Sequence, residues 1–313
     1  MSNQKPSYRI TNWSEYNKSL KQRGSLTIWL SEDFEENWLA VKQDKKGCGR
    51  PFLYSDNCMK LMLTLRHLFK LALRQLTGFV DSLFGLLGKT LPVPEFSRLS
   101  KRMETSLSGL HLPSLEKDSH LIIDSSGLKV FGEKEWLETK YGKQYQRKVW
   151  RKLHIGIDRQ GFIVAREMTT HLTDDRSCIP SLLTQAKAKN AHDLLADGGY
   201  DSHAIYHYLK EKNIKPIIPP PTSAVIFSTT SPTVRDQTVD YIKKKGYWSW
   251  HTKTDYGRRN KVENTFYRLK TIFGRKIISR KWVNQDAETH LLCYLLNKMI
   301  ELGMPKTIKV KAI

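Results

Sequence analysis

The segment between residues 121 and 218 alternates strand-like and helix-like patterns, and this order limits the folds that are open to the chain. Three strand patterns come first, and a helix, a strand, a helix and a strand follow. In chain order they cover residues 121–130, 148–158, 161–169, 177–190, 193–197, 202–213 and 214–218. Strands that alternate with helices in this way predict an α/β fold with a mixed sheet flanked by helices.

Two acids of the strand patterns stand out. Asp124 interrupts an apolar run, where a charge is costly unless it is paired or bound to a metal. Asp197 ends a shorter run, and Gly198 and Gly199 keep the backbone that follows it free of Cβ atoms. The carboxyl ends of strands are where sites assemble in such sheets. Each acid alone also fits an ordinary strand end or turn.

A third acid lies on an amphipathic helix pattern that begins near residue 256. Glu263 shares one stripe of this helix with Arg259 and Lys270, at offsets of four and seven residues. A second, apolar stripe contains Val262, Phe266, Leu269 and Phe273. An Arg–Glu pair on a solvated helix explains Glu263 by itself. Together with the two upstream acids, Glu263 instead fits a carboxylate that binds a divalent cation while its basic neighbours bind phosphates.

Three carboxylates at one sheet can hold two Mg²⁺ ions close together. Such a pair of ions activates water or a 3′-hydroxyl and stabilises the leaving oxygen in phosphodiester transfer. The ligands are oxygens, and no His/Cys pattern accompanies them. Mg²⁺ or Mn²⁺ is therefore favoured over zinc.

The charge of the chain indicates a polyanionic partner. Lys and Arg total 52 against 31 Asp and Glu, which gives a formal charge of +21. Nucleic acid is the first candidate; a membrane surface is the alternative, but the basic residues do not gather beside an apolar span. The N-terminus has no signal-peptide pattern, and basic residues interrupt the most apolar stretch, residues 61–76. The widely spaced Cys48, Cys58, Cys178 and Cys293 fit reduced thiols in a cytosolic protein.

The N-terminal third contains three helix patterns. They begin near residue 54, at residue 73 and at residue 95, and the last two end at residues 87 and 107. The third carries Arg98, Lys101 and Arg102. Either this is a helix-turn-helix whose last helix enters the major groove, or it is a three-helix packing unit without DNA; the positive charge favours DNA. Upstream, residues 24–30 fit a short strand or a helix start, and the basic turn at residues 45–51 fits a minor-groove contact or a solvated linker.

The three acids resemble the DDE set of bacterial insertion-sequence transposases with an RNase H-like catalytic core. The stretch Tyr256-x2-Arg259-x3-Glu263-x6-Lys270 matches the Y-R-E-K signature of that class at every spacing. The segment DSSGLKV that starts at Asp124, the segment ADGGYD at residues 196–201 and the segment WRKLHIGID at residues 150–158 are also similar to the family. The closest resemblance is to the insertion-sequence-five group, and it runs from about residue 8 to the last helix pattern at residues 287–302.

The resemblance implies a DNA transposase that binds the terminal inverted repeats of an insertion sequence and catalyses metal-dependent strand cleavage and strand transfer. Asp124, Asp197 and Glu263 would be the catalytic and metal-binding residues, with Mg²⁺ as the cofactor and Mn²⁺ as a substitute. Arg259 and Lys270 would bind phosphates near the scissile bond, and Tyr256 would pack on the adjacent strand. The partners would be double-stranded DNA, as inverted-repeat ends and as target, and further copies of the chain in a homodimer or higher multimer, with no membrane. The location would be cytoplasmic and nucleoid-associated.

The same resemblance suggests a domain plan. Residues 1–115 form an N-terminal helical DNA-binding region, residues 116–218 the first part of the RNase H-like core, residues 219–255 a short insert, residues 256–304 the second part of the core and residues 305–313 a basic, loose tail. Within the insert, Trp248 and Trp250 either stack a displaced base or serve as packing residues.

Several polar residues near the candidate strands leave alternatives open. His154, His171 and His203 are expected to be structural rather than supporting groups of the site, and Asp174, Asp175 and Asp201 are acids that compete for the assignment. Two rival functions also remain at this point: an RNase H-like nuclease or resolvase that never joins strands, and a non-catalytic DNA-binding regulator that uses the N-terminal helices.

Overall fold

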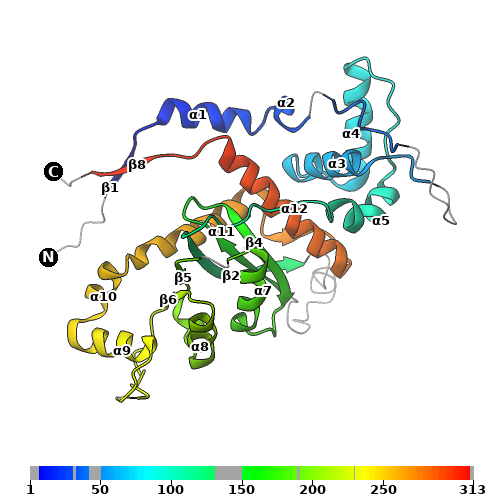
Figure 1. The fold of residues 1–313 in the computed structure, drawn as a ribbon. Helices are drawn as coiled ribbons and strands as arrows, with labels where there is room; N and C mark the ends of the chain where they lie inside the picture. Colours follow the sequence, from blue (N-terminus) through cyan, green and yellow to red (C-terminus); the bar gives the residue numbers. More distant parts are fainter. Residues whose placement is uncertain are drawn as a thin grey trace, which may run out of the picture. The chain divides into compact units, whose positions relative to one another are not determined.

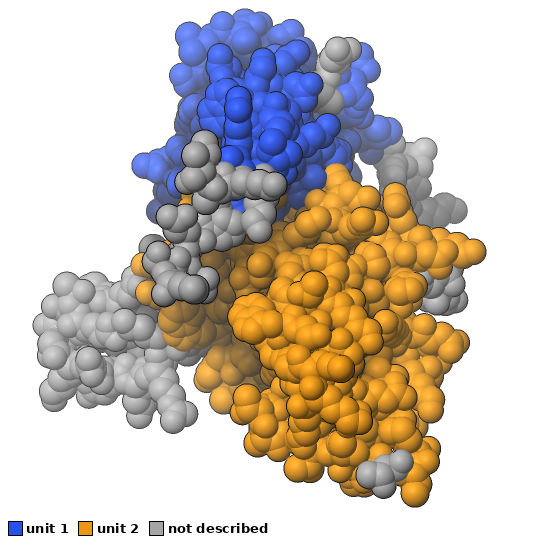
Figure 2. All heavy atoms as spheres, turned by 90° about the vertical axis from the view of Figure 1, so that its left-hand side faces the viewer, with its two compact units in different colours: residues 1–109, 294–313 blue, residues 110–293 orange. Residues whose placement is uncertain are grey.

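The computed structural model describes residues 7–30, 33–41, 51–130, 150–188, 191–228 and 230–310. The chain divides into two compact units (Figure 2). The first unit contains Met1–Gly109 and Tyr294–Ile313, and the second contains Leu110–Cys293. The predicted domain boundaries are not tested by this division and stay predictions.

The second unit is built on a mixed sheet (Figure 1). Its strands are β2 (His120–Val130), β3 (Trp150–Ile157), β4 (Ile163–Thr170), β5 (Asp193–Leu195), β6 (Lys215–Ile217) and β7 (Lys276–Ile277). The order is β4-β3-β2-β5-β6, with β7 beside the end of β2. The first three strands are antiparallel neighbours, whereas β2, β5 and β6 run parallel. This α/β arrangement confirms the expected fold class and agrees with an RNase H-like core.

The turn between β3 and β4 forms as the sequence predicts. The carboxylate of Asp158 accepts hydrogen bonds from the backbone N–H groups of Gly161 and Phe162, at 2.7 and 2.9 Å. Gly161 has a φ of +97°, a conformation that residues with a Cβ rarely adopt. The turn therefore fixes the hairpin and brings both strands into the sheet beside β2.

Helices cover both faces of the sheet. The elements of this unit are η1 (Asp175–Cys178), α7 (Ile179–Gln185), η2 (Gly198–Tyr200), α8 (His203–Glu211), α9 (Val234–Lys245), α10 (Tyr247–Lys253), η3 (Tyr256–Arg259), α11 (Asn260–Phe273) and the start of α12 (Trp282–Glu301). Side chains alternate along β2. Leu121 and Ile123 pack in one core with α7 and α8, so the alternate residues, Asp124 among them, face α11. Burying each large aliphatic side chain contributes roughly 1.5–3 kcal/mol.

The first unit is a helical bundle with a short ribbon. Its elements are β1 (Ser7–Ile10), α1 (Trp13–Gln22), α2 (Leu26–Trp29), α3 (Asp56–Leu68), α4 (Leu73–Leu86), α5 (Phe96–Leu107), the end of α12 and β8 (Thr307–Val310). The predicted cap is present, because the Ser55 hydroxyl accepts a hydrogen bond from the Cys58 N–H at 3.0 Å. The Trp38 and Phe84 rings meet edge-on at 5.0 Å in the core between α3, α4 and α5.

Some expectations were wrong or incomplete. The tail is not loose, because Thr307–Val310 pairs antiparallel with Ser7–Ile10. Of the two alternatives left open for residues 24–30, the structure shows the helix, α2. Helix α12 begins five residues before the predicted start. Two helices, α9 and α10, occupy much of the insert. A capping box between Thr233 and Asp236 begins α9 and was the overlooked signal.

Other features agree with the sequence. Cys58, Cys178 and Cys293 are buried free thiols; Cys48 and residues 45–50 of the basic turn lie outside the described residues. In the part of the chain that the structure describes, every helix is too short or too polar to cross a bilayer.

Candidate active site

Asp124 and Asp197 come together because β2 and β5 are parallel and in register. Ile122 of β2 pairs with Leu195 of β5. Asp124 comes two residues after Ile122, and Asp197 comes two residues after Leu195. Asp124 lies within β2, where its side chain is 13% exposed. Asp197 follows the end of β5 and begins η2, and its side chain is 44% exposed. The two carboxylates therefore lie beside each other at the carboxyl end of β5, where this strand stops alongside the middle of β2.

The two glycines after Asp197 lie where a Cβ would be tightly packed against neighbouring oxygens. One carboxylate oxygen of Asp197 accepts a hydrogen bond from the Gly199 N–H at 2.9 Å. A Cβ at Gly199 would lie 3.0 Å from that same oxygen, and a Cβ at Gly198 would lie 3.1 Å from the Pro219 carbonyl oxygen. Glycine at both positions thus lets the backbone curl under the carboxylate without displacing it.

Arg259 connects all three acids of the DDE set. Its Nη2 atom lies 3.4 Å from an Asp124 oxygen and 3.8 Å from an Asp197 oxygen, and its Nη1 atom lies 2.5 Å from Glu263. The carboxylates of Asp124 and Asp197 both contact the Nη2 atom of Arg259, so these two carboxylates are close neighbours. The three predicted acids, which are far apart in the sequence, are therefore gathered around one cation.

The turn that carries Arg259 is anchored to β5. The buried Tyr256 hydroxyl donates to the Ala196 carbonyl oxygen at 3.0 Å, directly before Asp197. Tyr256 also packs against the buried Trp250 ring at 5.1 Å. The preceding Asp255 has a left-handed φ of +48°, which turns the chain into η3. This anchor places Arg259 at the acids, and Tyr256 packs on the strand as the resemblance implied.

The electrostatics of Asp124 are unusual for a carboxyl group. Burial raises the pKa of Asp124 to about 6, and the nearby Asp197 and Glu263 carboxylates add to the rise. The Ser125 N–H and the Arg259 guanidinium oppose it. The hydrogen bond from Ser125 to Asp124 measures 2.8 Å. Such a group gains from additional positive charge beside it.

Lys270 lies further along the same face of β2. Its ammonium group donates to the Ser126 hydroxyl at 2.6 Å. Burial and the nearby Arg275 lower the pKa of Lys270. Ser126 is two residues beyond Asp124 and therefore points to the same side of the strand. The structure thus brings Lys270 to the neighbourhood of the acids, one strand repeat away.

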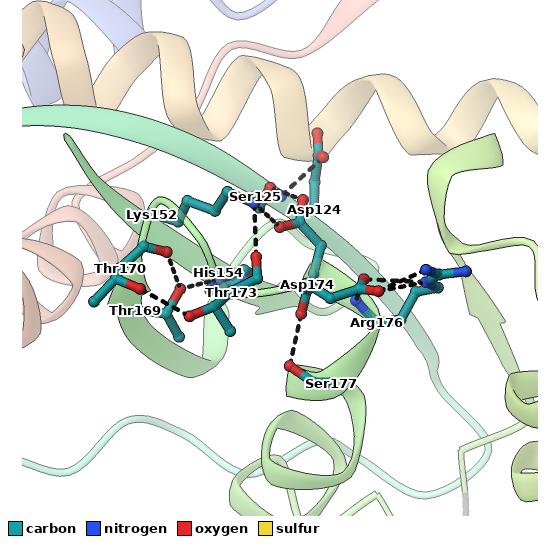
Figure 3. A network of polar contacts seen from close by, with 11 residues as sticks. Asp124, Ser125, Lys152, His154, Thr169, Thr170, Thr173, Asp174, Arg176 and Ser177 are labelled. Carbon is teal, nitrogen blue, oxygen red and sulfur yellow. Dashed lines mark hydrogen bonds and ion pairs between the residues drawn. The ribbon is translucent and has the colours of Figure 1, made fainter. Parts of the chain in front are cut away.

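A polar network behind Asp124 was not predicted (Figure 3). The Ser125 hydroxyl donates to Asp175 at 2.5 Å, and Lys152 donates to the other Asp175 oxygen at 2.7 Å and to the Thr173 carbonyl at 2.8 Å. Asp175 is thereby engaged with Ser125 and Lys152 and holds β2 next to Asp124 in place. The sequence signal was present as the Asp174-Asp175 pair, but only the fold shows which strand it reaches.

Asp174, Asp201 and His154 have structural partners. Asp174 pairs with Arg176, and Asp201 pairs with Arg235 at 2.8 Å. His154 is fully buried and shares a hydrogen bond of 2.8 Å with the Thr169 hydroxyl, and burial lowers its pKa. His171 and His203 are exposed. The contacts of Asp174, Asp201 and His154 engage these side chains away from the DDE acids.

The remaining predicted residues lie in separate places. On α5, Arg98 and Lys101 are exposed, whereas Arg102 pairs with Asp56 at 2.6 Å and covers the Phe52 ring at 4.2 Å. In the insert, Trp250 is 4% exposed and Trp248 is 75% exposed. Packing therefore accounts for Trp250, and Trp248 remains free to contact a partner.

Two groups of residues have donors that suit a metal. The DDE acids offer carboxylate oxygens around Arg259. In the described part of the chain, one tighter group has three ligand atoms within 4.8 Å of one another, and it consists of His120, His192 and Asp193. It is separate from the DDE acids and has a different donor chemistry.

Comparisons with known proteins support a transposase. A family model described as "Transposase DDE domain" matches residues 115–298, and a second model with the same description matches residues 21–133. Among solved structures, a piggyBac transposase synaptic complex with hairpin DNA has 10% identity and a TM-score of 0.41, over 93% of this chain and 76% of that one. A Mos1 mariner paired-end complex with Mn has 12% identity and a TM-score of 0.24, over 94% and 89%.

TM-scores below 0.5 do not establish a common fold, and the insertion-sequence-five group stays a prediction. The match at residues 115–298 is decisive, because it covers more than half of the chain and contains all three acids. The chain therefore belongs to the DDE transposase family, whose members use divalent metal ions to cleave and join DNA.

Proposed function

We propose that this transposase acts on the terminal inverted repeats of an insertion sequence, with Asp124, Asp197 and Glu263 as the ligands of its divalent cations. The observation that carries the proposal is the contact of one guanidinium, that of Arg259, with all three carboxylates. Three acids that collect around a cation have the charge and the donor atoms to bind another.

The donor set supports Mg²⁺, with Mn²⁺ as a substitute. All three side chains offer hard carboxylate oxygens, which these ions prefer. Burial raises the pKa of Asp124 to about 6, and a bound dication relieves the cost of keeping this acid ionised. When bound, the metal ions supply activation of water or a 3′-hydroxyl and stabilisation of the leaving oxygen.

The basic residues of the site have roles in positioning. Arg259 offsets part of the charge of the acids before DNA arrives, and a scissile phosphate beside them offers its guanidinium another anionic partner. Lys270, one strand repeat beyond Asp124, adds a second cation for the DNA backbone. Tyr256 keeps the turn on β5, so that Arg259 stays within reach of both the acids and the phosphate.

The helices α3, α4 and α5 are proposed to bind the inverted repeats. Arg98 and Lys101 are exposed on α5 and are available to phosphates or base edges. Arg102 is already engaged with Asp56, so it contributes to binding mainly through the shape of α5. A homodimer or higher multimer on paired ends, acting in the cytoplasm at the nucleoid, completes the proposal.

A joining assay tests the function. The full chain is incubated with Mg²⁺, a DNA end made from the inverted repeats that flank the coding sequence, and a target plasmid. Joined end–plasmid products are expected. Nicked plasmid without joined products would indicate a nuclease or resolvase, and end binding that is insensitive to EDTA without any cleavage would indicate a regulator; either result contradicts the proposal.

A further inference from the structure

The amino ends of β2 and β5 carry a second polar cluster that the DDE chemistry does not use. His120 opens β2 and Asp193 opens β5, and the two residues are direct partners in the parallel register. Asp124 follows His120 by four residues, and Asp197 follows Asp193 by four residues. At roughly 3.3 Å per residue, the two groups lie about 13 Å apart along the strands. The cluster is therefore a separate place in the fold.

Two imidazoles, those of His120 and His192, contact the buried carboxylate of Asp193 in this cluster. The Nδ1 atom of His120 lies 2.6 Å from one Asp193 oxygen, and the Nδ1 atom of His192 lies 3.3 Å from the other. The rings meet edge-on, with centroids 5.8 Å apart. The three ligand atoms all lie within 4.8 Å of one another. Ligands about 2 Å from a tetrahedral zinc ion are separated by roughly 3.3 Å, so small shifts of the rings bring these atoms to coordination distance.

The backbone holds these three residues in place. The His192 N–H donates to the Ser119 carbonyl at 2.9 Å, and its carbonyl accepts from the Lys215 N–H at 3.2 Å. His120 and Asp193 are fixed by the strand pairing itself. A site whose ligands sit on rigid strands loses little conformational entropy when an ion binds.

The burial of the cluster is uneven in a way that suits a ligand. Asp193 is 2% exposed, whereas the His192 side chain is 60% exposed. A solvent ion therefore has a route to the carboxylate past His192. Three protein ligands leave a fourth position for water, as in many zinc sites.

Arg258 is the remaining contact of the carboxylate. Its Nη2 atom lies 3.5 Å from the Asp193 oxygen that faces His192. The closer His120 contact is on the opposite oxygen. Arg258 thus orients the carboxylate from outside, as hydrogen-bonded partners of metal ligands commonly do.

We propose that His120, His192 and Asp193 bind a zinc-class transition-metal ion, which ties β2 to β5 at the end of the sheet away from the DDE acids. Two imidazole nitrogens and one carboxylate oxygen suit Zn²⁺, Co²⁺ or Ni²⁺, whereas Mg²⁺ prefers oxygen ligands. The chain therefore discriminates between two metal classes at two places. This proposal stands independently of the function proposed above.

The test is Co²⁺ and Zn²⁺ binding by the full chain, free of affinity tags and stripped with EDTA. Co²⁺ is expected to give visible d–d absorption with one equivalent bound and no thiolate charge-transfer band, and Zn²⁺ is expected to displace it while excess Mg²⁺ does not. His192→Gln is expected to weaken Zn²⁺ binding by at least about tenfold. His207→Gln is the matched control, because His207 is exposed on α8 and outside the cluster.

The Asp197→Asn variant separates the two places. It is expected to keep the Co²⁺ spectrum and the Zn²⁺ affinity of the wild-type chain. The proposal is overturned if no stoichiometric ion binds, if His192→Gln binds Zn²⁺ as tightly as wild type, or if Asp197→Asn abolishes the Co²⁺ spectrum. Circular dichroism of each variant confirms that the fold is retained, and His120→Gln repeats the test from the other strand.

Discussion

Arg259 lies 3.4 Å from Asp124, although 135 residues separate them in the chain. This contact joins the helix end that carries the third acid to the strand that carries the first. It also means that the acids are held together by a resident positive charge before any metal or DNA arrives. The single charge of Arg259 offsets part of the repulsion between the three carboxylates, and the remaining repulsion adds to the rise of the Asp124 pKa.

Neutralising Asp124 is expected to stabilise the fold. Because the folded chain raises the Asp124 pKa to about 6, its ionisation at neutral pH costs free energy that an amide does not incur. Asp124→Asn should raise the free energy of unfolding at neutral pH by on the order of 1 kcal/mol in urea melts without metal. The gain should vanish below about pH 4, where the carboxyl is protonated in the folded and the unfolded chain. A loss of stability at neutral pH would show that Asp124 is a structural ion-pair partner instead.

Metal affinity is expected to depend on pH through the same group. Below about pH 6 protons compete with the metal for Asp124, so Mn²⁺ affinity should fall by up to about tenfold for each pH unit. Titration of the free Mn²⁺ signal by electron paramagnetic resonance between about pH 5 and pH 8 measures this slope. An affinity that stays constant over this range would contradict a role for Asp124 as a ligand.

Gly199 allows a test of whether the position of the Asp197 carboxylate matters for cleavage. A methyl group at Gly199 would lie 3.0 Å from the Asp197 carboxylate, so Gly199→Ala should displace this oxygen and lower cleavage by at least about tenfold. Gly109→Ala is the control, since a Cβ there meets nothing within 4 Å. Equal activity of both variants in an end-cleavage assay would mean that the position of Asp197 is not critical.

The hydrogen bond that anchors the turn carrying Arg259 can be removed by deleting one oxygen atom, the Tyr256 hydroxyl. Tyr256→Phe deletes the hydrogen bond to the Ala196 carbonyl and should lower the free energy of unfolding by about 1 kcal/mol. Cleavage should fall as well, because the turn positions Arg259. Tyr267→Phe on α11 is the matched control, with a side chain that is largely exposed, and it should match wild type in both measurements. Unchanged cleavage by Tyr256→Phe would separate the turn from the chemistry.

Local signals account for what the sequence predicted well. Helices α3, α4 and α5 begin close to their expected residues, and α4 and α5 also end close to them. The Ser55 cap and the left-handed Gly88 are signals that act over one turn. The strand residues around Asp124 and Asp197 were recognisable from apolar runs and glycines. The acids were therefore identified as candidates from patterns that need no tertiary information.

Contacts between residues far apart in the chain account for what the sequence did not predict. β1 pairs with β8 from opposite ends of the chain, and no local pattern encodes that choice. The register that places His120 beside Asp193 spans 73 residues, so the histidine cluster was invisible. Likewise, the hydrogen bond between Ser125 and Asp175 depends on where η1 packs against the sheet.

Cleavage of an inverted-repeat DNA end by the Asp124→Asn, Asp197→Asn and Glu263→Gln variants tests most directly whether the three acids form one metal-binding catalytic site. With saturating Mg²⁺, each variant should cleave at least about a hundredfold more slowly than wild type while binding the end with unchanged affinity. Asp174→Asn, which alters an acid paired with Arg176, should cleave normally. Wild-type cleavage by any one of the three variants would contradict the shared site.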